Sequence, residues 1–345
     1  MNTNRIHTIF SELALAIFVS VFLSSCEGIR DNMDDCGIYL EFIYDYNMEY
    51  TDAFDPQVGS VDLFIFDAQD KYLFTRHSSR EELIGHKRIF LGNNLPFGAY
   101  KILTVGGLSD NFRITGKNGS QLIPGETTPN ETQIALVRST NTVSHEFPPL
   151  WIGVTQEVDY HADLSVHPIH LIKETNLFNL VLARSDNGQQ TKAATSNAAY
   201  TFEIITPEGA VYGHDNTPVS KETVTYTPYT LTAGETGSEA IAEAHINTAR
   251  LLHKTAYNYR LTVRSTESGK VLWDYDLMKL LEHTKPASRP DGTPLSMQEY
   301  LDRQSEWHIV VVYKGDEETP GSSDNFVAVK VIVNDWIIWL NDIEV

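Results

Sequence analysis

Cysteine is nearly absent from this chain of 345 residues, and basic residues are scarce. Only Cys26 and Cys36 occur, so the sequence cannot build a disulfide framework or a zinc site made of cysteines. The 26 Lys and Arg residues stand against 46 Asp and Glu residues, which gives a formal net charge of -20. This balance argues against nucleic acid and anionic lipid as partners, because both need a basic surface.

A membrane-spanning run is also missing near the N-terminus. The apolar segment 13–23 has eleven residues, well short of the ~20 needed to cross a bilayer. It follows a short polar segment containing Arg5 and ends in Ser24-Ser25-Cys26. This layout predicts a secretory signal peptide over residues 1–25. The cysteine directly after the small residues predicts a bacterial lipoprotein, in which the Cys26 thiol is acylated and cleavage occurs before it. The alternative is a plain signal peptide with an incidental cysteine.

Acylation of Cys26 would leave Cys36 without a partner in the chain. We interpret Cys36 as a small apolar residue at the start of the first strand; a bond to another chain is the alternative. Residues 26–35 are polar and acidic and predict a flexible tether, and they resemble the signal that directs Bacteroidota lipoproteins to the outside of the outer membrane. The tether residues Asp31, Asp34 and Asp35 do not fit a calcium-binding loop.

Catalytic and phosphate-binding motifs are missing as well. The chain has no Gly-x-Ser-x-Gly, no His-Glu-x-x-His and no glycine pattern that cradles phosphate. A cluster of His161, His167 and His170 could suggest zinc, but Pro168 lies between the last two and no carboxylate stands at a useful spacing. We interpret these histidines as exposed residues on a connector between domains. The sequence thus predicts no enzyme, no cofactor and no metal.

An aromatic run offers one candidate binding surface. It consists of Tyr44, Tyr46, Tyr50 and Phe54, whose rings could stack on a sugar. Aromatic residues at strand ends more often pack against a core, and the exposure of these rings distinguishes the two interpretations.

Short β-strand patterns dominate the remainder of the chain. The predicted strands are residues 38–44, 61–66, 88–91, 100–105, 133–137, 154–160, 177–182, 200–205, 224–231, 240–247, 259–264, 307–313 and 326–333. Ser296 and Glu299 have the spacing of a capping box and predict a short helix ending near Arg303, and residues 276–281 suggest another helical turn. We expect an all-β protein with two β-sandwich domains in tandem, over residues 36–167 and 168–345, with a helical insertion in the second.

Several segments together resemble one family, the fimbrial anchor lipoproteins of the Bacteroidales. The longest is Tyr-Asp-Tyr-Asn-Met-Glu-Tyr-Thr-Asp-Ala-Phe at residues 44–54, followed by segments 56–58 and 61–67. The others are residues 95–100, 298–303, 333–336 and 340–342. The resemblance extends over residues 36–345.

The resemblance implies two transthyretin-like sandwiches on a lipidated tether at the base of a type V pilus. Such proteins hold the fibre on the outer membrane and limit its length, and fibre subunits join by strand exchange. It therefore implies two partners, a fimbrial shaft subunit and the outer membrane, reached through acyl chains on Cys26. A surface lipoprotein that binds a glycan or a host ligand is the alternative function.

Two details of the assembly step are open from the sequence. We predict that residues 326–345 contact the shaft subunit, while their alternative role is to close the protein's own second sandwich. The resemblance also implies that shaft subunits become competent when a protease cuts after a basic residue, and Arg76, Arg80 and Arg88 are candidates for such a cut on residue type alone.

Overall fold

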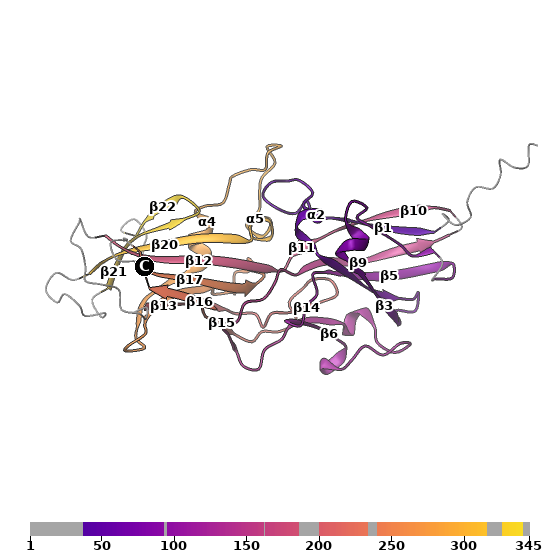
Figure 1. Cartoon of the computed structure of the whole chain (residues 1–345), viewed down its shortest axis with the longest axis horizontal. Coiled ribbons are helices and arrows are strands. Elements are labelled where there is room, and N and C mark those ends of the chain that lie inside the picture. The colour runs from indigo at the N-terminus through magenta and orange to yellow at the C-terminus, as the bar shows by residue number, and fades with distance from the viewer. Residues whose placement is uncertain are drawn as a thin grey trace, which may run out of the picture.

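The structure is a computed structural model that describes residues 37–92, 95–161, 163–185, 200–233, 240–315 and 326–340. In these ranges the chain is all-β with few, short helices. The strands run along the length of an elongated molecule, with the N-terminal half at one end and the C-terminal half at the other (Figure 1). The all-β prediction is confirmed.

The N-terminal half contains two facing sheets. Their strand orders are β10-β1-β4 and β11-β9-β5-β2-β3. The strands are β1 (Ile38–Ile43), β2 (Ser60–Phe66), β3 (Tyr72–Ser79), β4 (Arg88–Phe90), β5 (Gly98–Gly106), β9 (Trp151–Tyr160), β10 (Ser165–His170) and β11 (Ile172–Lys173). Two single-turn helices accompany them, α2 (Phe54–Gln57) and α3 (Arg80–Leu83). β1 alternates buried and half-buried residues, as expected for a strand with one face on a core.

The C-terminal half also contains two large sheets, with strand orders β16-β17-β12-β20-β21-β22 and β19-β18-β13-β15-β8. A third, small sheet, β14-β7-β6, lies beside the N-terminal half, near β3 (Figure 1). The strands are β6 (Phe112–Thr115), β7 (Gln133–Leu136), β8 (Thr142–Val143), β12 (Thr175–Arg184), β13 (Tyr200–Thr206), β14 (Val211–Gly213), β15 (Val224–Tyr226), β16 (Thr230–Ala233), β17 (Ala240–Ala249), β18 (Arg260–Ser265), β19 (Val271–Asp276), β20 (Glu306–Gly315), β21 (Phe326–Val333) and β22 (Trp336–Trp339). Two 3-10 turns, η4 (Lys117–Gly119) and η5 (Pro129–Glu131), lie between β6 and β7.

Both predicted helices in the C-terminal half are confirmed. α4 (Leu277–Glu282) begins after Asp276, whose side chain accepts hydrogen bonds from the amides of Met278 and Lys279. α5 (Met297–Arg303) begins after Ser296, whose hydroxyl accepts a hydrogen bond from the Glu299 amide at 3.1 Å. These side chains satisfy amides that a helix start leaves without partners.

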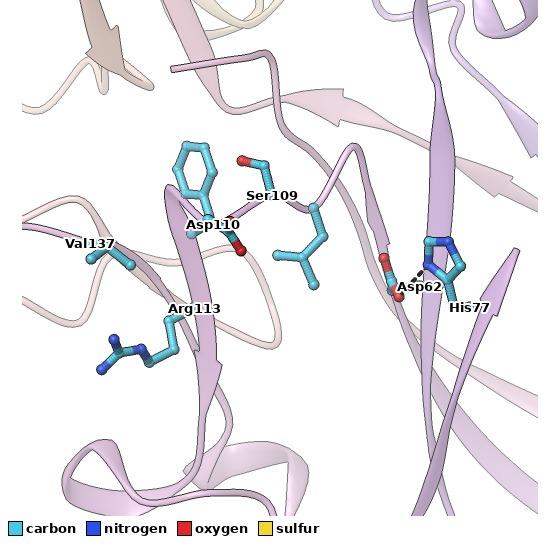
Figure 2. A pocket seen from close by; sticks show the side chains of 8 residues that line it. Asp62, His77, Ser109, Asp110, Arg113 and Val137 are labelled. Atoms are coloured by element: carbon cyan, nitrogen blue, oxygen red, sulfur yellow. Dashed lines mark hydrogen bonds and ion pairs between the residues drawn. The ribbon is translucent and has the colours of Figure 1, made fainter. Parts of the chain in front are cut away.

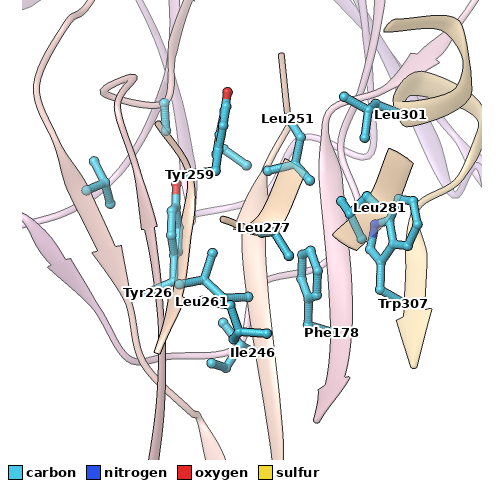
Figure 3. Close-up of a cluster of buried hydrophobic side chains, with 14 of the residues drawn as sticks. Phe178, Tyr226, Ile246, Leu251, Tyr259, Leu261, Leu277, Leu281, Leu301 and Trp307 are labelled. Carbon is cyan, nitrogen blue, oxygen red and sulfur yellow. The ribbon is translucent and has the colours of Figure 1, made fainter. Parts of the chain in front are cut away.

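Buried side chains form two clusters, and the larger one extends through the C-terminal half (Figure 3). Phe178 of β12 stacks on Trp307 of β20, with ring centroids 6.2 Å apart, and Tyr300 of α5 meets the same indole edge-on at 5.6 Å. The helical insertion therefore covers one end of this core.

β2 contacts both clusters at once. Leu63 and Ile65 belong to the smaller cluster of the N-terminal half, whereas Phe64 and Phe66 belong to the larger one. A strand buried on both faces reads as a continuous apolar run instead of an alternating one. This explains the nearly continuous apolar sequence, interrupted only by Asp62, that predicted this strand.

Strand pairing crosses the predicted boundary at 167/168 in several places. β8 pairs with β15, and β7 pairs with β14, although β7 and β8 precede position 168. β10 runs across the predicted boundary at 167/168 and pairs with β1. The chain passes from the N-terminal sheets into β12 at Glu174, between β11 and β12.

Two local predictions were wrong. Residues 224–231 form two separate strands, β15 and β16, instead of one. His167 and His170 lie in β10 and not on a connector. Proline removes a ladder hydrogen bond, but β10 is the edge strand of its sheet, where Pro168 is tolerated.

Candidate functional site: an exposed edge and a braced junction

The segment predicted to contact a shaft subunit separates into two parts in the structure. β21 is paired on both sides, with β20 and with β22. β22 is the last strand of its sheet in the described part of the chain. Of residues 326–345, β22 therefore presents the free strand edge, and residues 341–345 lie outside the described residues.

β22 also exposes large apolar side chains. Trp336, Ile337 and Trp339 are 61%, 56% and 53% exposed, and Val327 of β21 is 63% exposed. Lys330 lies 5.5 Å from the Trp339 ring. Solvated edge strands usually carry charge or proline to prevent pairing with other chains. An apolar edge of this kind is suited to strand addition by a partner.

A two-residue turn fixes the position of β22. Asn334 and Asp335 both have positive φ, 43° and 72°, which is the pattern of a type I′ hairpin turn. The Asn334 side-chain oxygen accepts a hydrogen bond from the His308 amide at 2.8 Å. The turn is thus tied to β20 as well as to β21.

The two halves are braced by Arg303 at the end of α5. Its guanidinium lies 4.1 Å from the Tyr46 ring centroid and 4.4 Å from that of Tyr50. It also donates hydrogen bonds to the carbonyl oxygens of Asp45 and Asn47, at 2.9 and 3.1 Å. A cation held between two rings and two carbonyls has its charge and several of its donors satisfied.

This contact settles the role of the aromatic run. Tyr44 and Phe54 are 1% exposed and pack on Trp151 and Phe42 respectively, while Tyr46 and Tyr50 enclose Arg303. The four rings do not form one exposed platform, because two of them are buried and the half-buried Tyr46 and Tyr50 contact Arg303. Loop 44–50 and α5 are far apart in the sequence, so no sequence pattern predicted the contact between them.

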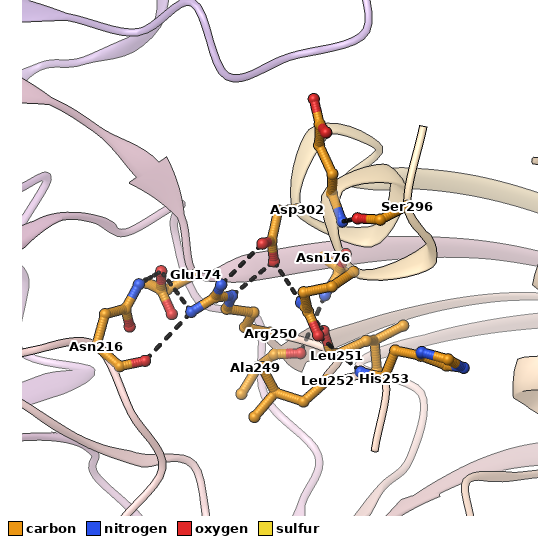
Figure 4. Close-up of polar contacts among 12 residues, drawn as sticks. Glu174, Asn176, Asn216, Ala249, Arg250, Leu251, Leu252, His253, Ser296 and Asp302 are labelled. Carbon is orange, nitrogen blue, oxygen red and sulfur yellow. Dashed lines mark hydrogen bonds and ion pairs between the residues drawn. The ribbon is translucent and has the colours of Figure 1, made fainter. Parts of the chain in front are cut away.

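A buried polar network lies where the chain crosses between the halves (Figure 4). Arg250 donates to both carboxylate oxygens of Asp302, at 2.7 and 2.8 Å, and lies 3.9 Å from Glu174. Asn216 donates to Glu174 at 2.7 Å. Burial raises the pKa of Glu174 to about 7, although Arg250 and Asn216 favour its ionised form. Sequence reasoning missed this network because its members come from distant segments.

A shallow depression of about 420 Å³ lies between β2, β3 and the chain around β6 (Figure 2). His77 contacts Asp62 at 2.9 Å, and burial raises the pKa of Asp62 while His77 lowers it. Ser109 also lines the depression, but no hydrogen bond joins it to His77 within the described residues. Among the described residues, no hydroxyl or thiol is hydrogen-bonded to this Asp-His pair, as the nucleophile of a hydrolytic triad would be.

The three histidines considered as zinc ligands each contact a different residue in the structure. His161 contacts Asp159, His167 contacts Ser165 and His170 contacts Asp45, each at 3.0 or 3.1 Å. His167 and His170 are three residues apart in a strand, so their side chains point to opposite faces. Over the described ranges, no group of three or more His, Cys, Asp or Glu residues is placed to hold a metal ion.

Comparison with known families identifies the class of protein. The sequence profile of the fimbrillin-A associated anchor proteins Mfa1 and Mfa2 matches residues 33–342. The chain belongs to this family of anchor proteins. Membership indicates a fimbrium-associated location at the cell surface and a structural role in fimbriae. A search of curated proteins finds no match.

Solved structures similar to this family member cover nearly its whole described length. A candidate adhesin from Bacteroides ovatus has 40% sequence identity and a TM-score of 0.80, with 92% of this chain and 98% of that chain covered. A candidate polysaccharide-binding protein from Bacteroides thetaiotaomicron has 28% identity and a TM-score of 0.72, covering 88% and 98%. The fimbrial anchor protein Mfa2 from Porphyromonas gingivalis shares the fold, with 17% identity, a TM-score of 0.61 and coverage of 88% and 98%.

The candidate cleavage sites of this anchor-family chain all lie in regular elements. Arg76 is in β3 and donates to the Phe90 carbonyl, Arg80 begins α3, and Arg88 is in β4 and pairs with Glu41 at 3.1 Å. A protease needs an extended segment that it can surround, so a cut at Arg76 or Arg88 requires local unfolding. Cleavage stays a prediction.

The predicted attachment residues of this family member lie outside the described residues. These are Cys26, the apolar segment 13–23, Cys36 and the acidic tether with Asp31, Asp34 and Asp35. Within the described ranges, no helix combines the length and apolarity needed to cross a membrane.

Proposed function

We propose that this protein is an outer-membrane lipoprotein that anchors a type V pilus at its base and limits the length of the fibre. The observation that carries the proposal is the match of the anchor family over residues 33–342. The lipoprotein motif ending at Cys26 adds a means of attachment, because two or three acyl chains give stable membrane binding at ~0.8 kcal/mol per buried methylene.

The exposed β22 edge is the proposed contact for the shaft subunit. A strand from that subunit would add beside β22, with backbone hydrogen bonds supplying affinity and Trp336 and Trp339 supplying apolar contact area. One such joint per anchor connects the fibre without extending it. This refines the predicted contact, residues 326–345, to the part whose edge is free.

The proposal includes a domain organisation. The two buried clusters would be the cores of two transthyretin-like sandwiches, broadly residues 36–167 and 168–345, with the crossing point moved to Glu174. Residues 26–35 would be the tether between the first sandwich and the acyl chains.

A Cys26→Ala variant in the native cell tests the anchor. We expect fibres to be shed into the medium, since the anchor would lose its acyl chains. The Cys26→Ala protein that stays with the cells should appear in the soluble fraction. A Ser24→Ala variant is the matched control, because it keeps a small residue before the cysteine. Fibres that stay attached at normal length in the Cys26 variant would remove the proposal.

An adhesin that binds a glycan or host ligand is the second candidate. It is supported by the descriptions of two similar structures, one as a candidate adhesin and one as a candidate polysaccharide-binding protein. The burial of Tyr44 and Phe54 withdraws two of the four rings from the surface that first suggested it. Normal fibre attachment in the Cys26 variant, together with loss of binding to host glycans, would favour this function instead.

A further inference from the structure

The end of the N-terminal half that lies away from the C-terminal half carries exposed apolar side chains. β1 ends near the junction, because the loop that follows it, residues 44–50, contacts Arg303. β1 therefore begins at the opposite end of the molecule, as the course of β1 and β10 in Figure 1 shows. Phe97, Leu164 and Val166 are 66%, 56% and 41% exposed there. We call these three residues the apolar tip.

Contacts place the apolar tip around Gly37, the first described residue before β1. The Ser165 amide donates to the Gly37 carbonyl at 3.0 Å, so Leu164 and Val166 flank that contact. Phe97 packs on Tyr160 with ring centroids 4.9 Å apart, and the Tyr160 hydroxyl donates to the Gly92 carbonyl. A side chain added at Gly37 would meet the Cα of Gly92 at 2.6 Å, which shows how close Gly37 and Gly92 are.

A row of apolar residues extends the tip across the outer face of the first sheet. Val166, Tyr39 and Phe90 are directly opposite one another on β10, β1 and β4. Directly opposite residues share one face of a sheet, and the Tyr39 and Phe90 rings lie 4.8 Å apart. Aromatic rings with a polar end beside aliphatic side chains are typical of surfaces that meet the interface of a bilayer.

The length of chain before Gly37 identifies the occupant of this surface. Cys26 and Gly37 are eleven residues apart in the sequence, and a chain of that length spans at most about 40 Å. An acylated Cys26 therefore keeps the Gly37 end of the molecule close to the lipid, while β22 belongs to the other half. Because the chain has a net charge of -20, apolar insertion and not attraction to anionic headgroups must supply this contact.

We infer that the apolar tip inserts into the interfacial region of the bilayer and gives the anchor a second contact with the membrane. This rests on the proposed acylation of Cys26. The second contact orients the molecule, so that the β22 edge points away from the surface and towards the fibre. A single flexible tether would not fix that direction.

Lipid-attached quenchers test the inference on the acylated full-length protein. In a Cys36→Ser background, a fluorophore is attached at Phe97→Cys, or at Ile337→Cys as the control in the far half, and the protein is reconstituted in phosphatidylcholine vesicles containing brominated acyl chains. We expect at least about twofold quenching at position 97 and no quenching at position 337, because an interfacial residue lies within ~5–10 Å of the acyl boundary. A second label, at Tyr39→Cys, is compared with the apolar tip intact and in the triple variant Phe97→Ser/Leu164→Ser/Val166→Ser. Both proteins should float with vesicles, but only the protein with the intact tip should show quenching.

The outcomes separate the two proposals. Protein that does not float with vesicles would refute the acyl anchor, and the tip inference with it. Protein that floats with equal signals at positions 97 and 337 would refute only the tip inference. The tip could instead bind a second copy of the chain. In that case the unacylated Cys26→Ala protein would have the mass of a dimer, and its label at position 97 would be shielded from quenchers dissolved in water. This result would also overturn the inference.

Discussion

Glu174 is the residue whose ionisation the fold perturbs at the crossing between the two halves. Its side chain is completely buried, and Oε2 has no hydrogen-bond partner among the described residues. Burial raises its pKa from 4.5 to about 7. The folded state therefore binds this proton more tightly than the unfolded state. The stabilisation from the protonated form is fully present below pH 4.5 and is lost as the pH rises through 7.

We predict that Glu174→Gln removes this pH dependence. Relative to the wild type, the variant should gain stability between pH 5 and pH 8 by about 3 kcal/mol, at ~1.4 kcal/mol per pH unit. Urea unfolding at several pH values measures the difference. Glu267→Gln, at an exposed position, is the control and should follow the wild type. Parallel curves for Glu174→Gln and the wild type would show that Glu174 is ionised in the folded protein.

Arg303 joins the two halves through ring contacts and hydrogen bonds. We predict that Arg303→Ala lowers the free energy of unfolding by ~2–4 kcal/mol, because two ring contacts, two hydrogen bonds and an ion pair with Glu299 at 2.8 Å are lost. Arg303→Lys keeps the charge but not the planar fork, and it should recover less than half of the loss.

A matched control for Arg303 is Arg260, which pairs with Asp274 at 2.7 Å on the surface. Arg260→Ala should cost less than about 1 kcal/mol, as exposed ion pairs do. Equal losses in the two alanine variants would show that the ring contacts contribute no more than a surface pair.

At this scale the sequence predicted local contacts and missed distant ones. The Ser296 cap was readable because its partner, Glu299, is three residues away. The Arg303 brace joins residues more than 250 positions apart, and no periodicity connects them. The aromatic run was identified from the sequence, but the contacts of Tyr46 and Tyr50 depend on the position of α5, which the sequence does not show.

β22 is the element on which the proposed fibre contact depends. We predict that Trp336→Ser/Ile337→Ser reduces fibre attachment about tenfold or more, because aromatic residues dominate the free energy of such interfaces. The free energy of unfolding should change by less than about 1 kcal/mol, since both side chains are more than half exposed. Counting cell-bound and released fibres measures the first effect, and urea unfolding measures the second.

Ile84→Ser/Val219→Ser is the control for this pair, because both side chains are exposed, at 53% and 48%, and neither belongs to the sheet of β22. Attachment should be unaffected in the control. A normal level of attached fibres in the Trp336/Ile337 variant would place the shaft contact on another surface.

Strands were predictable where their burial pattern is simple. β1 alternates and β2 is apolar apart from Ser60 and Asp62, and both were located within a residue or two. β3, β6, β14 and β19 were missed because their sequences mix exposed and buried residues without a clear period. β10 was missed because proline is acceptable at an edge, and a sequence does not reveal which strand forms the edge.

At the scale of the whole molecule, side chains from both sides of position 168 share the larger buried cluster. Phe112, Leu136, Val143 and Phe147 lie before the predicted boundary but belong to the larger cluster. We predict that a fragment of residues 168–345 does not fold on its own, since it lacks these side chains and the pairing of β8 with β15. Near-UV circular dichroism and urea unfolding of the fragment, beside the chain 26–345, measure this. A sharp unfolding transition in the fragment would establish an independent C-terminal domain.

β1 gives the molecule a particular response to load. It lies between β10 and β4, and its six residues are each in register with a residue of β10. A pull on the chain before Gly37 acts along the strand, so the ladder hydrogen bonds on both sides would be sheared together instead of being peeled apart one at a time. Detachment by force would then require all the ladder hydrogen bonds of β1 to break together. The lifetime of the attachment under flow would be set by the rate at which β1 is pulled out of its sheet.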